Sequence, residues 1–327
     1  MEHGITVRRI PQPAPPTGSL LEAAGRRLFV DIKGSGGPPV IFLAGAGLSG
    51  LDYFGAQQRV AEFATVVLYD RSGTGWSDPA PVPITSTAVT DELRALLQEI
   101  GIDGPAVLVG HSLGGLYARH YASRFPDKVA GLVLLDPAHE NYDAHMPEEL
   151  RQKRGSDPTL KILDAVMSVA LRTRFTRALL ARVPAVKRYA TLYRRLFADE
   201  MSSWPRNVTD SLVERHGSVE WLAVGLNEAR NIETRYAEVR AAGPLPDIPL
   251  VILSSMRTDP FQEAVAQGVS PELVRAEREG KTLLYKELAA SVPRGEVRMV
   301  DSGHVTIALR CADEVARAVR DVTRAID

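Results

Sequence analysis

Short apolar runs that alternate with helical patterns constrain the fold of this 327-residue chain more than any other feature. The runs are rich in β-branched residues, and several carry apolar residues at successive positions, as strands do when both faces of a sheet are covered. Strands of this kind separated by helices indicate an α/β fold, a mostly parallel twisted sheet flanked by helices. The predicted strands are 27–32, 40–43, 65–69, 106–109, 130–135, 250–253 and 296–300, and the predicted helices include 91–100, 113–124 and 313–325.

The alternation stops between residues 137 and 247. Roughly a hundred residues pass there without a strand pattern, far more than a connection inside a compact domain needs. Apolar side chains recur there at helical spacing, as at Phe175, Leu179 and Val183. We therefore expect an all-helical cap inserted into the sheet domain. The predicted domains are an extended N-terminal tail over residues 1–20, an α/β core over residues 21–137 and 247–327, and the helical cap over residues 138–246.

Composition and charge bear on the classes of partner. The formal net charge is −1, so no overall charge draws the chain to nucleic acid. No apolar run reaches the roughly 20 residues needed to cross a bilayer, which argues against stable membrane insertion. The first residues are rich in proline and lack the apolar core of a signal peptide, so we expect a cytoplasmic protein. No motif sets an oligomeric state.

Two minor features have plain structural interpretations. Between residues 151 and 200, twelve Lys or Arg stand against four Asp or Glu, and we interpret this as a solvated outer face of the cap. The single cysteine, Cys311, lies at the start of a helical pattern and is expected to be a small packed residue.

A Gly-x-Ser-x-Gly motif joins a predicted strand to a predicted helix at Gly110, Ser112 and Gly114. A serine on such a sharp turn is strained, and tiny residues two positions away on either side let the backbones approach. The turn places the Ser112 hydroxyl at the N-terminus of the following helix, where free N–H groups favour a developing negative charge. An ordinary tight turn would also fit this motif. The neighbouring motifs favour Ser112 as a nucleophile.

A serine hydroxyl attacks poorly without a base within hydrogen-bond reach. Among the seven histidines, His304 is best placed because it follows the last predicted strand. It would therefore lie at the same edge of a parallel sheet as Ser112, the edge where sites form in open α/β sheets. His111 is adjacent to the serine, and its side chain should point away from that of Ser112. We predict His304 as the general base.

The base needs a carboxylate to hold its tautomer and to stabilise the imidazolium ion. Asp259 follows the predicted strand at 250–253, which gives the chain order Ser, Asp, His. Asp136 is the alternative, because it ends the predicted strand at 130–135, although it could instead cap a loop. We prefer Asp259 and keep Asp136 as the alternative acid. Asp301 is interpreted as a turn residue.

Acyl transfer also needs donors for the oxyanion of a tetrahedral intermediate. The backbone N–H of Leu113, directly after the nucleophile, supplies one. The second is expected from Ala46 in the glycine-rich loop 44–47, where small residues let the main chain approach a substrate carbonyl. This loop has neither Gly-x-Gly-x-x-Gly nor a P-loop lysine, which argues against a phosphate site.

With these residues in place, the chain resembles the α/β-hydrolase fold superfamily, of the type with a helical cap between the sixth and seventh core strands. The segments that carry the resemblance are 43–47, 70–77, 110–115 and 303–304. The second is similar to a turn found after the fourth strand of many members, and we interpret Asp70 and Arg71 as bracing loops near the site. Many relatives carry His-Gly where this chain has Ala44-Gly45, a departure that removes a side chain which often braces the oxyanion loop.

The resemblance and the residues together predict acyl transfer to water through a covalent intermediate. Ser112 in place of Asp argues against the epoxide hydrolases and haloalkane dehalogenases of the superfamily. The expected substrate is a small-molecule carboxylic ester, thioester, lactone or amide, and neither a metal nor an organic cofactor is required. Two alternatives share the motifs, a non-hydrolytic enzyme (lyase, cyclase or acyltransferase) and a ligand receptor that retains the triad. Aromatic residues of the cap could line the pocket, although helical spacing favours core packing for most of them: Tyr189, Tyr193, Trp204 and Trp221.

Overall fold

A computed structural model describes most of the chain, namely residues 14–80, 84–151, 182–218, 232–258 and 270–326, with residues 176, 179, 221, 224, 225, 227 and 228. The strands are β1 (Ser19–Ala23), β2 (Arg26–Lys33), β3 (Val40–Leu43), β4 (Val66–Tyr69), β5 (Ala106–His111), β6 (Val129–Leu135), β7 (Leu250–Ser255) and β8 (Gly295–Val300). The α-helices are α1 (Phe54–Val60), α2 (Ser86–Glu99), α3 (Leu113–Arg124), α7 (Pro184–Glu200), α8 (Arg206–His216), α10 (Ile232–Ala241), α12 (Pro271–Ala290), α13 (Thr306–Arg310) and α14 (Ala312–Arg324), and the 3-10 helices are η1 (Gly50–Tyr53), η2 (Pro126–Lys128) and η3 (Tyr142–His145).

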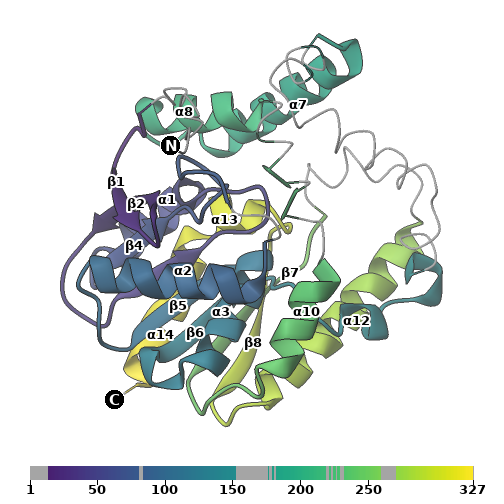
Figure 1. The fold of residues 1–327 in the computed structure, drawn as a ribbon. Helices are drawn as coiled ribbons and strands as arrows, with labels where there is room; N and C mark the ends of the chain where they lie inside the picture. Colours follow the sequence, from purple (N-terminus) through teal and green to yellow (C-terminus); the bar gives the residue numbers. More distant parts are fainter. Residues whose placement is uncertain are drawn as a thin grey trace, which may run out of the picture.

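The strands form one eight-stranded sheet in the order β1-β2-β4-β3-β5-β6-β7-β8 (Figure 1). The pairs from β4 through β8 are all parallel, whereas β1–β2 and β2–β4 are antiparallel. The carboxyl ends of β5, β6, β7 and β8 therefore meet at one edge of the sheet, because parallel strands run in the same direction. The predicted mostly parallel α/β sheet is confirmed.

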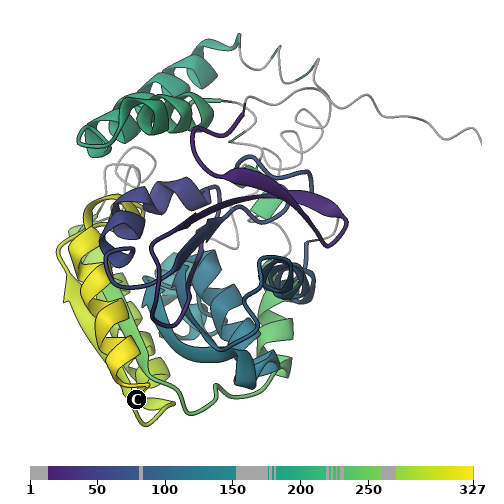
Figure 2. The same ribbon diagram turned by 90° about the vertical axis from the view of Figure 1, so that its left-hand side faces the viewer.

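Two apolar cores explain why this sequence forms a layered structure. Every residue of β3, β4, β5 and β7 is buried, as expected of strands covered on both faces. Side chains of α1, α13 and α14 pack on one face of the sheet, and side chains of α2, α3, α10 and α12 pack on the other. Figure 2 shows α14 and α2 on opposite sides of the strands.

Between β6 and β7 the described residues form helices and contain no strand. Helices α7 and α8 lie above the sheet (Figure 1) and pack against each other. Buried contacts join them to the core, since Phe197 of α7 is fully buried and the His216 ring of α8 contacts the Asp52 carboxylate at 2.6 Å. Most of the basic 151–200 segment lies outside the described residues, and the domain limits of the cap remain a prediction.

Strand β1 and helices α1, α12 and α13 were not predicted from the sequence. Strand β1 begins at Ser19, although residues up to 20 were expected to form a tail. It is a short edge strand with one buried residue. Because few of its side chains face the core, its sequence shows little apolar periodicity. Helix α12 is rich in charge and contains Gly280, which weakens a helical signal. A Cβ at Gly280 would come within 2.0 Å of the His145 carbonyl oxygen, so close packing requires this glycine. Cys311 is buried, as predicted.

Candidate active site

Ser112 stands on a strained turn between β5 and α3. Its backbone has φ 50° and ψ −119°, in the left-handed half of backbone space that non-glycine residues rarely enter. The flanking glycines make this turn possible, because a Cβ at Gly110 would meet the Gly114 carbonyl oxygen at 2.7 Å. A Cβ at Gly114 would lie 2.0 Å from the Leu43 carbonyl oxygen. The glycines therefore have the steric role that the motif predicts.

His304 lies within hydrogen-bond distance of Ser112. Its Nε2 is 3.0 Å from the Ser112 Oγ, and its Nδ1 is 2.7 Å from Oδ2 of Asp136. A carboxylate can only accept, so Nδ1 carries the proton and Nε2 is left to accept from the serine hydroxyl. The structure thus brings together one hydroxyl, one imidazole and one carboxylate from the ends of β5, β8 and β6, in the arrangement that activates a serine.

Asp136 follows β6 directly and has a positive φ of 42°. Its other oxygen, Oδ1, accepts from the Ser255 backbone N–H at 3.0 Å and faces the Lys281 ammonium at 2.9 Å. Burial alone would raise the pKa of Asp136, but the hydrogen bond from His304 and the charge of Lys281 outweigh it and hold the pKa well below its ordinary value. Asp136 is therefore ionised at neutral pH.

Asp259, the acid preferred from the sequence, lies outside the described residues. Among the described carboxylates, Asp136 is the one that contacts the His304 ring. Lys281 was not predicted from the sequence, because it lies on the unpredicted helix α12, far along the chain from Asp136. Its one sequence signal would have been a lysine on the buried side of an amphipathic helix.

A cavity of about 580 Å³ opens in front of the serine. Its walls include Ser112, His304 and Asp136, together with residues of η3, α10, α12 and the β7–α12 connection. The lining side chains beyond these three include Pro137, Leu150, Tyr142, Tyr236, Val274 and Arg278. A volume of this size is typical of pockets that hold small molecules.

The two predicted oxyanion donors lie on opposite sides of Ser112 in the chain. Leu113 is the first residue of α3, so its N–H belongs to the free N–H groups of a helix start. Ala46 lies exposed in the turn after β3. Within the described part of the chain, neither backbone N–H donates to a protein acceptor. Both are thus available to a ligand oxygen.

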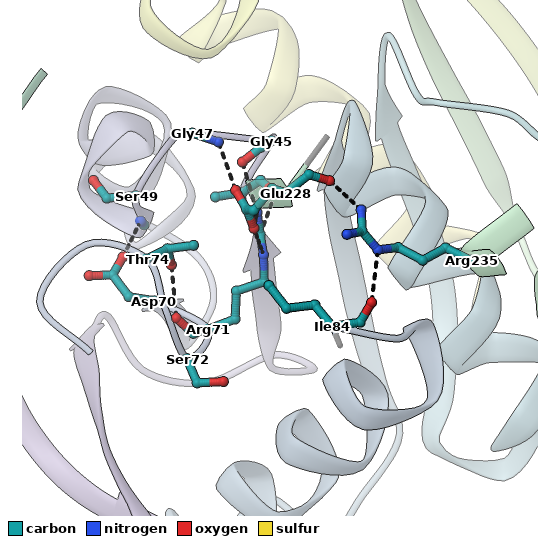
Figure 3. Close-up of polar contacts among 12 residues, drawn as sticks. Gly45, Gly47, Ser49, Asp70, Arg71, Ser72, Thr74, Ile84, Glu228 and Arg235 are labelled. Carbon is teal, nitrogen blue, oxygen red and sulfur yellow. Dashed lines mark hydrogen bonds and ion pairs between the residues drawn. The ribbon is translucent and has the colours of Figure 1, made fainter. Parts of the chain in front are cut away.

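Arg71 and Asp70 brace loops near the site, as predicted (Figure 3). Arg71 donates to the Ala44 and Gly45 carbonyl oxygens at 2.6 and 2.9 Å. The Asp70 carboxylate accepts from the backbone N–H groups of Gly50 and Trp76 at 2.7 and 2.8 Å. Burial raises the pKa of Asp70 to about 6, although these two hydrogen bonds lower it.

A second histidine, His111, lies next to the site, with its ring centroid 5.1 Å from that of His304. Its Nε2 is 2.8 Å from the His304 carbonyl oxygen, so Nε2 is the protonated nitrogen. Its Nδ1 then accepts from the Tyr53 hydroxyl at 2.7 Å, and the Tyr53 oxygen accepts from the Gly45 N–H at 3.0 Å. Burial, with the nearby His304, lowers the pKa of His111 to about 3. This neutral histidine links the backbone of the base to the loop after β3.

The aromatic residues of the predicted cap divide between packing and loop contact. Tyr193 packs against Phe197 with its ring centroid 6.5 Å away, and Trp204 packs against Phe54 at 5.6 Å. The Trp221 indole donates to the Gly47 carbonyl oxygen. The side chain of Tyr189 lies outside the described residues. Tyr193, Trp204 and Trp221 therefore do not line the cavity, whereas Tyr142 and Tyr236 of the same predicted segment do.

Among the described residues, no group of three His, Cys, Asp or Glu side chains could hold a metal ion together. No helix in that part of the chain is long and apolar enough to cross a membrane.

Comparison of the sequence with known proteins finds a matching family and relatives that match part of the chain. Residues 40–318 match the family described as the alpha/beta hydrolase family. An uncharacterized Mycobacterium tuberculosis protein is 31% identical over 145 residues, which cover 44% of this chain and 42% of that protein. Lipase LipV of M. tuberculosis is 54% identical over 69 residues, 21% of this chain and 26% of LipV. The chain thus matches less than half the length of these curated relatives.

Solved structures resemble most of the chain. A thermophilic esterase from Thermogutta terrifontis superimposes with a TM-score of 0.57 at 21% sequence identity, and the match covers 94% of this chain and 97% of the esterase. At this identity the likeness establishes the fold and leaves the substrate open.

Proposed function

We propose that this chain, which belongs to the alpha/beta hydrolase family, is a serine hydrolase that cleaves a carboxylic ester, thioester, lactone or amide. One observation carries the proposal: the Ser112 Oγ lies 3.0 Å from His304 Nε2, while His304 Nδ1 lies 2.7 Å from the Asp136 carboxylate. Family membership supports the class of enzyme, and the residues around the serine support the chemistry.

The first half of the reaction acylates the serine. Nε2 of His304 takes the hydroxyl proton as the Ser112 oxygen attacks the carbonyl carbon of the substrate. The carbonyl electrons move onto its oxygen, where the N–H groups of Leu113 and Ala46 stabilise the negative charge. The imidazolium form of His304 is stabilised by Asp136. It then gives its proton to the leaving group as the carbon–heteroatom bond breaks.

The second half releases the acid. Nε2 of His304 takes a proton from water, which attacks the acyl carbon through the same oxyanion site. The ester bond to Ser112 then breaks, and the imidazolium returns its proton to the serine oxygen. Asp136 acts as the carboxylate of this triad because it is ionised, buried and bonded to Nδ1.

The cavity in front of Ser112 limits the substrate to a small or medium molecule. Its volume of about 580 Å³ falls inside the usual range for small-molecule sites. Its walls mix apolar side chains such as Val274 and Leu150 with polar ones such as Tyr236. This lining supports an acyl group with both apolar and polar parts.

The test combines a fluorophosphonate probe with a panel of p-nitrophenyl acyl esters. The wild-type enzyme should be labelled on Ser112 and should turn over one or more esters many times. Ser112→Ala should lose labelling and should lose roughly 10⁵-fold or more in kcat, as nucleophile removal does in serine hydrolases. Thermal unfolding of both proteins checks that the variant is folded.

The outcomes separate the alternatives. Labelling of Ser112 without turnover of any ester would indicate a non-hydrolytic enzyme or a receptor that retains the triad. An unlabelled wild-type protein would refute the activated serine and, with it, the proposed function.

A further inference from the structure

The backbone of Gly47, next to the proposed oxyanion donor Ala46, is hydrogen-bonded by two residues between β6 and β7. The Glu228 carboxylate accepts from the Gly47 N–H at 2.7 Å, across 181 positions of sequence. The Trp221 indole donates to the Gly47 carbonyl oxygen. Glu228 is buried, with 3% of its surface exposed. A segment remote in sequence therefore determines where this part of the loop lies.

Arg71 links the same carboxylate to the other half of the loop. The Glu228 Oε1 accepts from Arg71 Nε at 2.7 Å, and Arg71 in turn donates to the carbonyl oxygens of Ala44 and Gly45 (Figure 3). Burial alone would lower the pKa of Arg71, but the facing Glu228 carboxylate outweighs it and the pKa lies above its ordinary value. The guanidinium stays charged and fully paired, with one carboxylate and two carbonyl groups as partners.

Glu228 is itself anchored through its main chain. Its carbonyl oxygen accepts from the Arg235 guanidinium, which also donates from Nε to the Ile84 carbonyl oxygen at 3.2 Å (Figure 3). Arg235 is a fully buried arginine, 1% exposed. A chain of largely buried ionic and hydrogen-bonded contacts thus runs from Ile84, just before α2, through Arg235 and Glu228, to the loop after β3.

Peptide geometry converts these contacts into the direction of one N–H group. The Gly45 carbonyl and the Ala46 N–H belong to the same planar, trans peptide unit, so they point in opposite directions. Arg71 holds the Gly45 carbonyl, and Glu228 holds the N–H of the next peptide unit at Gly47. The orientations of the two peptide planes that flank Ala46 are therefore fixed by these contacts. Its N–H donates to no acceptor in the described part of the chain.

We propose that Glu228 is a positioning residue that aims the Ala46 N–H at the oxyanion, acting through Arg71 and Gly47. This inference rests on the proposed function, and it makes a residue between β6 and β7 part of the transition-state site of the core. Ala44 has no polar side chain with which to brace the loop, so Glu228 and Arg71 do so from outside it.

The decisive experiment compares the kinetics of Glu228→Ala with those of the wild type on a p-nitrophenyl ester. We expect kcat to fall roughly 10²-fold, the cost of losing or misplacing one oxyanion donor. KM should stay within about threefold, because the ground-state carbonyl needs this donor less. A trifluoromethyl ketone that forms an oxyanion adduct with Ser112 should bind more weakly by about the same factor. The acid limb of the pH profile should not move, because His304 and Asp136 are untouched.

Two further variants separate position from charge. Glu228→Gln keeps an acceptor for the Gly47 N–H but presents an amide N–H to the Arg71 guanidinium, so kcat should recover only in part. The double variant Arg71→Met/Glu228→Met leaves no unpaired buried charge, so it should fold even if Glu228→Ala does not. We expect the double variant to lose kcat as Glu228→Ala does. Recovery of wild-type kcat in it would show that charge imbalance caused the loss, and would overturn the inference.

Glu140 provides a matched control. Its carboxylate forms a buried bidentate pair with Arg119 at 2.7 and 2.8 Å, between α3 and the residues after β6, and it does not touch the 44–47 loop. Glu140→Ala should lower thermal stability much as Glu228→Ala does while kcat stays within about threefold of the wild type. An equal loss of kcat in both variants would reduce Glu228 to an ordinary structural residue.

Hydrogen exchange keeps this inference separate from the proposed function. Glu228→Ala should speed exchange of the Gly47 amide, because that N–H loses its acceptor. If the wild type shows neither labelling nor turnover, the proposed function fails, and unchanged exchange at Gly47 would independently refute the anchoring by Glu228.

Discussion

The two sides of Ser112 are built in different ways. On the side of proton transfer, His304 and Asp136 come from the ends of β8 and β6, two core strands on either side of β7, and contact each other directly. On the side of the proposed oxyanion site, the Ala46 N–H is a backbone group with no side chain to specify it. It is placed by Arg71 and by Glu228, which lies between β6 and β7.

The difference shows how side-chain and backbone chemistry are secured. The chemistry of a side chain is set by its residue type, so placing that residue at the end of a strand is enough to bring the right group to the site. A backbone donor is the same at every residue and gains its function only from its direction, which neighbouring contacts must fix. The first side depends on few residues and the second on a network. Changes on the first side should therefore be severe, and changes on the second should be graded.

After the loss of Ser112 itself, the largest expected effect is on the proton-transfer side, at Asp136. Asp136→Asn would present an amide to Nδ1 of His304 and favour the wrong tautomer, so kcat should fall roughly 10³- to 10⁴-fold. Steady-state kinetics measure this loss, and Asp259→Asn is the matched control, expected to stay near the wild type. A severe loss in Asp259→Asn with a mild one in Asp136→Asn would reverse the assignment of the acid.

Lys281 tests whether the charge behind Asp136 matters. Lys281→Met removes the partner of a buried carboxylate, so kcat should fall roughly tenfold as Asp136 stabilises the imidazolium less well. The pKa of Asp136 should rise towards its ordinary value. The pKa of Asp136 is lower in the folded protein than its unfolded value of 3.8, so ionised Asp136 stabilises the fold at pH values above 3.8. This stabilisation is lost as pH falls through the folded pKa.

Chemical denaturation as a function of pH therefore checks Lys281→Met without reference to activity. The variant should lose less stability than the wild type as pH drops below about 4, because less of its stability comes from ionised Asp136. Identical pH dependence in the two proteins would contradict a role for Lys281 in holding Asp136 ionised.

Tyr53 tests the link between the two sides. Tyr53→Phe leaves the Gly45 N–H without its acceptor and His111 Nδ1 without its donor, at a cost of roughly 1–3 kcal/mol in the free energy of unfolding. We expect kcat to fall by about threefold to tenfold. Tyr69→Phe is the control, since the buried Tyr69 hydroxyl has no hydrogen-bond partner among the described residues and its removal should cost nothing or stabilise slightly. Equal losses of stability at the two positions would speak against the Tyr53 hydrogen bonds.

The smallest effect on catalysis is expected at His111. Its pKa of about 3 lies below the ordinary 6.5, so between these values the unfolded chain binds a proton that the folded protein does not. The free energy of unfolding should therefore decrease as pH is lowered from 6.5 to about 3, by on the order of 1.4 kcal/mol per pH unit from this group. His111→Gln keeps one acceptor and one donor, so kcat should change by only about threefold while the pH dependence becomes shallower. An unchanged slope would mean that His111 titrates normally.

The sequence was most informative where side chains follow buried strands. The runs that became β3, β5 and β7 were visible because covered strands need apolar residues on both faces. The position of Ser112 after β5 followed from the same pattern, and His304 was placed by the predicted strand at 296–300, which became β8. Strand β1 and helix α12 were missed because an exposed edge strand and a charged helix with Gly280 carry weak periodic signals.

The sequence by itself determined the fold class, the strained serine turn and the edge of the sheet where a site could form. It could not choose between carboxylates at the ends of neighbouring strands, since each satisfies the same pattern. Only the tertiary structure brought Asp136 against His304, Lys281 behind Asp136, and Glu228 against Gly47. The physical reason is that periodicity records which face of an element is buried, whereas contacts between residues more than a hundred positions apart depend on how the elements pack.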